Sequence, residues 1–317
     1  LRGDGGRMNT LWNEGGPSGL GWSEVDAYLR CPKEYQFAKV RGISKMQTNI
    51  PDYFAVGSFV HAGRARWFAQ KFDTGAETWQ LIRDDITKVR SEFQLPCNDS
   101  AETTALRYIQ EYVDHWGIRP HPQIVAVEHM LGPTRLDADE ASSERTSRLD
   151  DFGFYQEAGG KLMIGELKTT SAPISDVANQ YTLHGQPLLQ RLLWELAPQG
   201  EASHGAVGGM VLDVVQKGYG GKRCTFARLV VPVDERPLSW FRNNLLDALR
   251  KKALIDWNTD AERRISSCTR LVGKARVACE YRDVCQFGRQ GVGGMAFEDG
   301  SLVSDWQDDG SQARPWD

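Results

Sequence analysis

Two short apolar segments constrain the fold more than any other feature of the chain. Residues 148–156 (RLDDFGFYQ) and 161–169 (KLMIGELKT) flank Ala158-Gly159-Gly160, a combination typical of two strands that meet at a turn. Three more segments have strand character and six have helical character. The three further strands are expected at 123–131, 208–216 and 225–233. The helices are expected at 23–38, from Ser58 onward, and at 78–94, 101–116, 175–197 and 236–254. This order predicts an α/β fold in which helices flank a central mixed β-sheet, with additional helices at the N-terminal side.

The same two strands bring reactive side chains together. Side chains alternate along a strand, so Glu166 and Lys168 share one face while Leu167 points into the core. Asp150 lies in the preceding strand with Asp151 beside it, so the shared face offers two carboxylates and an amine. Hard divalent cations such as Mg²⁺ bind carboxylates, backbone carbonyls and water, which makes Asp150, Glu166 and the Leu167 carbonyl candidate metal ligands. Lys168 would orient or deprotonate the water that attacks a phosphodiester, while the metal stabilises the developing negative charge.

Composition excludes several other classes of protein. The chain has 317 residues, of which 40% are hydrophobic and 25% charged, and 38 basic against 42 acidic residues give a net charge of −4. These fractions are typical of a globular protein with one elaborated domain or two ordinary ones. The best apolar candidate for a membrane span, 205–215, is too short and contains Asp213. We therefore expect no membrane partner and, because no signal segment is recognisable, a cytoplasmic protein.

The segments TSRLDDFGF and KLMIGELKTTS resemble the Asp…(Asp/Glu)-x-Lys signature of the PD-(D/E)XK nuclease superfamily. They are most similar to its RecB-type branch, which includes CRISPR-adaptation exonucleases and phage-encoded relatives. The resemblance covers residues 21–290 and implies a restriction-endonuclease-like core with a Mg²⁺- or Mn²⁺-dependent nuclease site. The branch pattern of arginine, aliphatic residue and aspartate favours Asp150 over Asp151 as the metal ligand.

Three further segments are similar to motifs of the same branch. VGSFVHAG resembles its first motif, in which a helix-borne histidine, here His61, is a metal ligand. AVEHML resembles the strand before the metal-binding aspartate, and Glu128 would add a carboxylate. GQPLLQRLL resembles the Gln-x-x-x-Tyr motif with Gln186 in the glutamine position, but Gln190 replaces the tyrosine. This replacement leaves open whether that position contacts DNA.

Each motif taken alone also has a purely structural explanation. An E-x-K sequence is common on half-exposed strands of alternating charge, and a histidine in the first turn of a helix often caps the helix or lies in the core. Gln186, which precedes Pro187, is also a plausible cap for a helix with a leucine-rich face. The nuclease interpretation depends on the occurrence of all these motifs in one order along the chain.

Four of the six cysteines form a second pattern. Cys31 lies in RCPKEYQF, whereas Cys268, Cys279 and Cys285 lie close together near the other end of the chain. In the iron–sulfur members of the RecB-type branch, one cysteine precedes the nuclease core and three follow it. The resemblance therefore implies a [4Fe-4S] cluster that staples the C-terminal segment to the core. The gap between Cys268 and Cys279 is wider than in the tightest version of this pattern.

Other interpretations of the cysteines remain open. Four thiolates also bind zinc, although structural zinc sites usually contain closely spaced cysteine pairs, which this chain lacks. Single buried cysteines behave as small apolar residues, and Cys97 and Cys224 are expected to be of this kind. A disulfide is disfavoured in a reducing compartment.

Charge is unevenly distributed along the chain. Residues 242–276 contain nine basic and four acidic side chains, whereas residues 293–317 contain six acidic side chains and one basic side chain. A basic segment attracts nucleic-acid backbones, although any single lysine or arginine can equally belong to a solvated helix face. The acidic end is rich in Gly and Ser and is expected to be a disordered tail.

We therefore expect a flexible leader (1–20), a nuclease domain with its cluster-binding elements (21–290) and an acidic tail (291–317). The expected activity is metal-dependent DNA hydrolysis by an exonuclease that acts on single strands or ends. Its expected setting is DNA repair or recombination, phage DNA processing or CRISPR adaptation, with recombination, integration or phage replication proteins as candidate partners. Asp150, Glu166, Lys168 and Gln186 are the expected catalytic residues. The alternative is a DNA-binding scaffold of the same fold with little catalytic activity.

Overall fold

A computed structural model describes residues 20–40, 44–45, 49–93, 95–139, 141–181, 184–218, 222–233, 235–256, 269–272, 275–278 and 295–296. The chain divides into two compact units. The first contains residues 1–18, 48–134 and 146–240, and the second contains residues 19–47, 135–145 and 241–317. Apart from residues 20, 295 and 296, the expected leader and the expected acidic tail lie outside the described residues.

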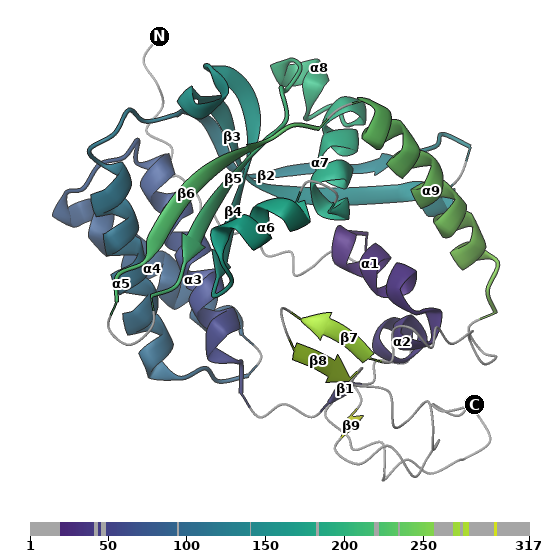
Figure 1. Ribbon diagram of the computed structural model, residues 1–317, viewed down its shortest axis with the longest axis horizontal. Coiled ribbons are helices and arrows are strands. Elements are labelled where there is room, and N and C mark those ends of the chain that lie inside the picture. The colour runs from purple at the N-terminus through teal and green to yellow at the C-terminus, as the bar shows by residue number, and fades with distance from the viewer. Residues whose placement is uncertain are drawn as a thin grey trace. The chain divides into compact units, whose positions relative to one another are not determined.

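A five-stranded mixed sheet forms the centre of the first unit (Figure 1). Its strands lie in the order β2-β3-β4-β5-β6, in which β3/β4 and β5/β6 are antiparallel and β4/β5 is parallel. The strands are β2 Gln123–Arg135, β3 Glu144–Tyr155, β4 Lys161–Thr170, β5 Met210–Gln216 and β6 Thr225–Val231. All five strands predicted from the sequence are confirmed. An α/β architecture with a mixed sheet between helices fits a restriction-endonuclease-like core.

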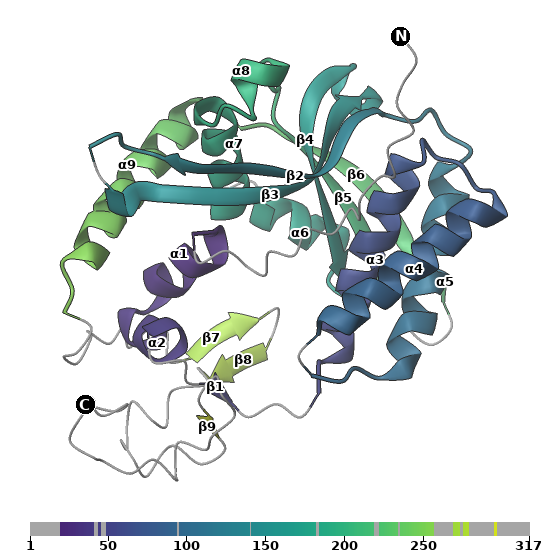
Figure 2. The ribbon, with the colours of Figure 1, turned by 180° about the vertical axis from the view of Figure 1, so that it is seen from behind.

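Helices cover both faces of this sheet (Figures 1 and 2). One group consists of α3 Asp52–Ala69, α4 Ala76–Glu92 and α5 Asp99–Trp116, and the other contains α6 Ile174–Tyr181 and α7 Gly185–Leu196, followed by α8 Glu201–His204. The first group packs on the sheet through a buried apolar cluster that includes Leu167 of β4 and Val215 of β5. Leu167 is fully buried, as the alternation along its strand predicts.

The start of α3 corrects one prediction. The sequence places a helix start at Ser58, but α3 begins at Asp52, directly after the extended Pro51. An acidic residue in the first turn interacts favourably with the helix dipole, which explains a start at Asp52. His61 consequently lies in the third turn of the helix and not in its first turn, so it is not a capping histidine.

Two predicted helices are interrupted. The segment 23–38 divides into α1 Trp22–Arg30 and α2 Pro32–Tyr35, because Pro32 begins a new helix after the extended Cys31. The segment 175–197 divides into α6 and α7, and the side chain of His184 caps α7 by accepting a bond from the Gln186 N–H at 3.3 Å. Gln186 is therefore inside α7 and does not cap it.

The second unit contains α1, α2, a π-helical turn Gln36–Val40, most of α9 Glu235–Ala253 and two small antiparallel pairs of strands. These pairs are β7 Thr269–Val272 with β8 Ala275–Ala278, and β1 Ser44–Lys45 with β9 Met295–Ala296. Buried Glu24 of α1 accepts hydrogen bonds from the Tyr35 hydroxyl at 2.7 Å and from the Lys252 amine of α9. This carboxylate ties three helical segments of the unit together. Over the described part of the chain, no helix is both long enough and apolar enough to cross a bilayer.

A close approach between two central strands gives the first testable prediction. Gly165 of β4 pairs with Asp151 of β3, and a Cβ at Gly165 would overlap the Asp151 carboxylate. We expect Gly165→Ala to lower the free energy of unfolding by about 1–3 kcal/mol, measured by urea denaturation, because overpacking displaces a buried charge. Gly57→Ala is the control, since its Cβ would meet only Thr169 Oγ1 at 3.2 Å and alanine favours the helix. Equal stability of the two variants would contradict this packing.

Candidate active site

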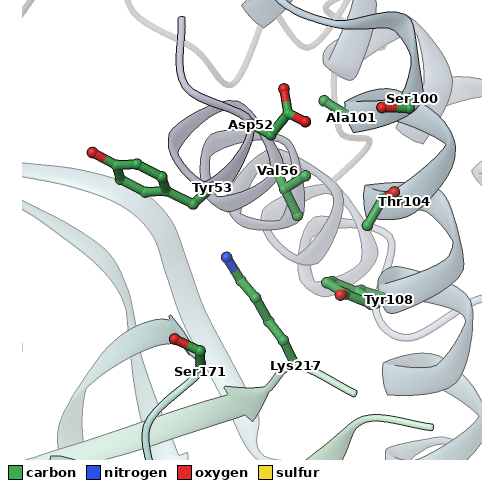
Figure 3. A pocket seen from close by; sticks show the side chains of 9 residues that line it. All are labelled: Asp52, Tyr53, Val56, Ser100, Ala101, Thr104, Tyr108, Ser171 and Lys217. Atoms are coloured by element: carbon green, nitrogen blue, oxygen red, sulfur yellow. The ribbon is translucent and has the colours of Figure 1, made fainter. Parts of the chain in front are cut away.

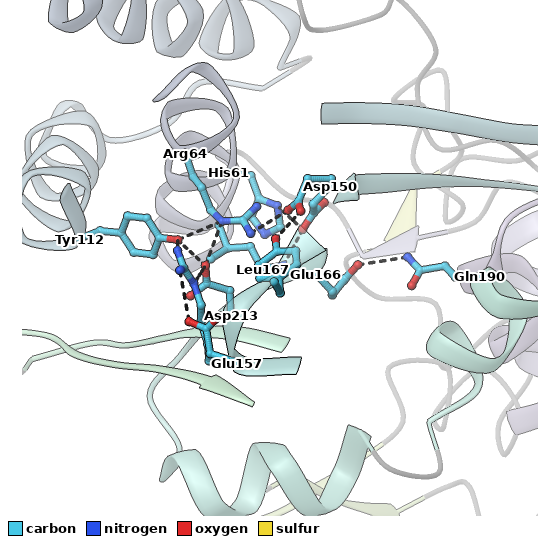
Figure 4. A network of polar contacts seen from close by, with 12 residues as sticks. His61, Arg64, Tyr112, Asp150, Glu157, Glu166, Leu167, Gln190 and Asp213 are labelled. Carbon is cyan, nitrogen blue, oxygen red and sulfur yellow. Dashed lines mark hydrogen bonds and ion pairs between the residues drawn. The ribbon is translucent and has the colours of Figure 1, made fainter. Parts of the chain in front are cut away.

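The His61 imidazole and the Asp150 carboxylate form the centre of the candidate site, where they point toward each other (Figure 4). His61 comes from α3 and Asp150 from β3. Nδ1 of His61 lies 3.2 Å from Oδ2 of Asp150, and the same oxygen accepts a hydrogen bond from the Leu167 backbone N–H of β4 at 2.7 Å. One helix and two consecutive strands therefore meet at one carboxylate oxygen.

His61 and Asp150 shift each other's pKa in opposite directions. Burial alone would lower the pKa of His61, but the adjacent Asp150 carboxylate raises it above its usual value. Burial alone would raise the pKa of Asp150, but His61, Arg64 and the Leu167 N–H hold it below its usual value. The interaction therefore stabilises Asp150 as a carboxylate and His61 in its protonated form.

Glu166 lies on the same face of β4 as Lys168 and is held by three donors. The Lys168 amine lies 2.7 Å from Oε1, the Gln186 amide donates to the same oxygen at 2.7 Å, and the Gln190 amide donates to Oε2 at 3.1 Å. Burial would lower the pKa of Lys168, but the neighbouring Glu166 raises it. Lys168 is thus a protonated donor at neutral pH in this arrangement, rather than a base.

Gln190 is a site residue whose role the sequence did not reveal. It appeared there only as a departure from the Gln-x-x-x-Tyr motif, yet it is fully buried and bonded to Glu166. Gln186 and Gln190 lie one turn apart on α7, so both amides reach one carboxylate. The i, i+4 spacing of two amides was the available signal for this shared role.

Glu128 of β2 lies within electrostatic range of the same junction. Its backbone has a positive φ of 51°, an uncommon conformation for a non-glycine residue, and its Oε2 lies 3.0 Å from Nε of Arg148. Burial and the neighbouring Asp150 raise the pKa of Glu128 to about 7. A third carboxyl group, paired with Arg148, therefore lies near His61 and Asp150.

The residues fit a divalent cation in donor type and in charge. The available donors are an imidazole nitrogen, carboxylate oxygens and the Leu167 carbonyl, a set that Mg²⁺ and Mn²⁺ accept. The Asp150 carboxylate, which raises the pKa of His61, is a negative charge that a cation would offset. Within the described residues, however, no three His, Cys, Asp or Glu side chains stand ready to hold a metal ion. Glu166 in particular is turned toward Lys168, Gln186 and Gln190.

Asp151 lies in a separate, buried network beneath the site. It is fully buried, its Oδ2 lies 2.7 Å from Nη2 of Arg64, and it accepts a hydrogen bond from the Tyr155 hydroxyl. Burial raises the pKa of Asp151, and the Arg64 guanidinium opposes this shift. Strand alternation thus directs Asp150 toward His61 and Asp151 toward Arg64.

The network continues from Arg64 to the neighbouring strands and helices. Arg64 Nε lies 3.2 Å from Oδ2 of buried Asp213 on β5 and 3.3 Å from the Tyr112 hydroxyl on α5. Arg228 of β6 approaches the same Asp213 oxygen at 3.3 Å and donates to the Tyr112 hydroxyl at 3.2 Å. Sequence analysis did not identify these residues. Their only local signal is that Arg64 follows His61 by three positions on one helix face.

The cysteines are only partly within the described residues. Cys31 is buried between α1 and α2, whereas Cys268, Cys279 and Cys285 lie outside the described residues. Cys224 is buried, and burial raises the pKa of its thiol to about 11, which makes it unreactive. Cys97 is half-buried.

The basic residues of α9 are engaged within the second unit. Arg242 donates to the Leu136 carbonyl at 2.8 Å, and Arg250 pairs with Asp137 at 2.8 Å. Lys251 pairs with Asp247 on its own helix at 2.7 Å, and Lys252 bonds to Glu24. This part of the basic segment therefore has intramolecular partners. Most of the remainder of 242–276 lies outside the described residues.

The two adjacent aspartates give the second prediction. We expect Asp151→Asn to lower the free energy of unfolding by about 3–5 kcal/mol, because it leaves Arg64 as an incompletely paired buried charge. Asp150→Asn should cost less, since an asparagine oxygen still accepts the bond from the Leu167 N–H. Urea denaturation of both variants measures the difference. A larger loss of unfolding free energy in Asp150→Asn than in Asp151→Asn would show that Asp150, and not Asp151, is the structural aspartate.

One of three comparisons with known proteins identifies a family. The family model of the PD-(D/E)XK nuclease superfamily matches residues 20–286, which is most of the chain. None of the curated proteins matches the sequence. A solved structure described as "Crystal structure of SSO0001" is 11% identical and covers 68% of this chain and 83% of its own, with a TM-score of 0.27, which is too low to support any inference. The family match shows that the chain belongs to the PD-(D/E)XK nuclease superfamily.

Proposed function

We propose that this protein is a Mg²⁺- or Mn²⁺-dependent deoxyribonuclease that acts as an exonuclease on single-stranded DNA or DNA ends. Membership of the superfamily implies nuclease activity. The observation that supports a working site is the junction of His61, Asp150 and the Leu167 N–H beside the Glu166–Lys168 pair. The RecB-type motifs support the choice of DNA as substrate and a cytoplasmic setting in repair or recombination, phage DNA processing or CRISPR adaptation. Recombination, integration or phage replication proteins would be its partners.

Each site residue has a chemical task in this proposal. His61, Asp150, Glu166 and the Leu167 carbonyl would hold the cation, which when bound would polarise the scissile phosphate and stabilise its developing charge. The Lys168 ammonium, which lies on the same strand face as Glu166, would donate hydrogen bonds to the attacking water and to a phosphate oxygen. Gln186 and Gln190 would keep Glu166 in a fixed orientation through their two amides.

Lys168 provides the direct test of this activity. We expect Lys168→Ala to lower the cleavage rate of labelled single-stranded DNA with Mg²⁺ or Mn²⁺ by about 10²–10⁴-fold, the usual cost of losing a positioned proton donor. Lys161→Ala is the matched control, because Lys161 is exposed at the opposite end of the same strand. A Lys168→Ala variant as active as the parent would refute the assignment. Metal-independent DNA binding without any cleavage by the parent would favour the scaffold alternative.

We further propose that Cys31, Cys268, Cys279 and Cys285 hold a [4Fe-4S] cluster. Cys31 is buried and belongs to the same compact unit as residues 241–317, which contain the other three. The wide gap between Cys268 and Cys279 contains the β7–β8 hairpin, in which Thr269 pairs with Ala278. These paired residues directly adjoin Cys268 and Cys279 in the sequence, and the two cysteines themselves lie outside the described residues.

The cluster is tested by its metal content. The anaerobically purified protein should be brown and contain about four iron and four sulfide ions per chain, as expected for a cluster held by four thiolates. Cys31→Ser should lower the iron content, whereas Cys97→Ser, the control at a half-buried cysteine outside the pattern, should not. A colourless protein loaded with zinc would show that the cysteines form a zinc site instead.

A further inference from the structure

A cavity of about 260 Å³ opens beside the first turn of α3, away from the residues of the candidate active site. Its polar lining comes from three parts of the first unit: Asp52 and Tyr53 on α3, Ser100, Thr104 and Tyr108 on α5, and Ser171 and Lys217, which directly follow β4 and β5 (Figure 3). The Lys217 amine points into the space between the start of α3 and Ser171. The cavity therefore combines one amine and one carboxylate, that of Asp52, with several hydroxyl groups.

The cavity lies on the same two elements that carry the candidate active site. Ser171 follows Lys168 by three residues along the chain from β4, a distance of about 10 Å in extended backbone. Tyr53 precedes His61 by eight residues on α3, a distance of about 12 Å along the helix. These backbone distances therefore place the cavity residues within the length of a few nucleotides of Lys168 and His61.

Lys217 has the properties of an anion-binding group. It is half-buried, and among the described residues no carboxylate lies within ion-pair distance of its amine. Burial lowers its pKa, so the amine lacks both full hydration and a compensating acid. The Lys217 backbone N–H is bonded to the Thr170 carbonyl at 2.7 Å, which fixes the base of the side chain. The carboxylate of Asp52, at the rim of the cavity, points away from the amine (Figure 3).

Tyr53 supplies an aromatic surface at the rim of the same cavity. Its side chain is 71% exposed, although it belongs to the first turn of a well-packed helix. Exposed aromatic rings and cationic groups that share one site bind single-stranded nucleic acid, because bases of any sequence stack on the rings. The cavity is also smaller than the roughly 300–1,000 Å³ of pockets that enclose small molecules. Its size favours one part of a longer ligand over a free cofactor.

We propose that this cavity binds one nucleotide of the DNA strand that is cleaved. Lys217 and the Ser171 hydroxyl contact a backbone phosphate, and the Tyr53 ring stacks on the adjacent base. This subsite rests on the proposed nuclease function. It adds to that function a path for single-stranded DNA at the start of α3. It would bind the strand without reading its sequence, because none of these contacts involves a base edge.

The test measures binding of a labelled single-stranded oligonucleotide to the full-length protein in EDTA, over a range of salt concentrations. Lys217→Ala should weaken binding and reduce the slope of log K against log salt by about 0.7, the value expected for one lost phosphate contact on a single strand. Tyr53→Ala should weaken binding about tenfold, while Tyr53→Phe, which keeps the ring, should bind like the parent. Lys161→Ala is the control for the loss of an exposed lysine. If Lys217→Ala does not fold, Lys217→Gln takes its place in the same measurement.

The outcomes separate the subsite from the nuclease function. Parent-like affinity and salt slope in the Lys217 variants would overturn the subsite, whatever the cleavage rate of the parent. The subsite would also be overturned if these variants no longer bound inorganic phosphate but bound the oligonucleotide with the affinity of the parent. A parent that fails to cleave DNA, but binds it through Lys217 and Tyr53, would overturn the nuclease function and support the subsite.

Discussion

The buried ion pairs of Arg64 determine where the candidate site can form. Arg64 lies one turn beyond His61 on α3 and contacts Asp151 of β3 and Asp213 of β5, both fully buried. Leaving such a charge unpaired costs about 3–5 kcal/mol, so α3 is held in one position against the sheet. That position also sets the distance between His61 and Asp150. His61 lies one turn from Arg64 on α3, and Asp150 directly precedes Asp151, the partner of Arg64, on β3.

Strand alternation separates structural from chemical roles at adjacent positions. Asp150 faces His61, whereas its neighbour Asp151 faces Arg64. In the same way, Glu166 and Lys168 pair with each other on one face of β4, while Leu167 packs into the apolar cluster on the other. The backbone of Leu167 nevertheless belongs to the site, since its N–H orients Asp150. The β3–β4 hairpin therefore supplies three of the reactive side chains, Asp150, Glu166 and Lys168, and also the backbone N–H that orients Asp150.

Local patterns predicted the strands well, because alternation and turn composition act over a few residues. The hairpin around Gly159 and Gly160 and the shared face of Glu166 and Lys168 are examples. The missed features depend on long-range contacts. Arg64 and Asp213 are separated by 149 positions, so no local pattern indicates their pairing. The role of Gln190 likewise depends on the packing of α7 against β4, and the true start of α3 depends on Pro51 and Asp52 rather than on the better capping residue Ser58.

Binding of Mn²⁺ to the full-length protein, followed by electron paramagnetic resonance, tests most directly whether these residues form a metal-dependent site. The parent should bind Mn²⁺, and His61→Ala and Asp150→Asn should each weaken that binding by about 10–100-fold or more, the scale on which even partners of metal ligands act. Gln180→Leu, a change at an exposed amide of α6, should bind Mn²⁺ like the parent. Mn²⁺ affinity that is unchanged in both His61→Ala and Asp150→Asn would contradict the metal site and the reaction proposed for it.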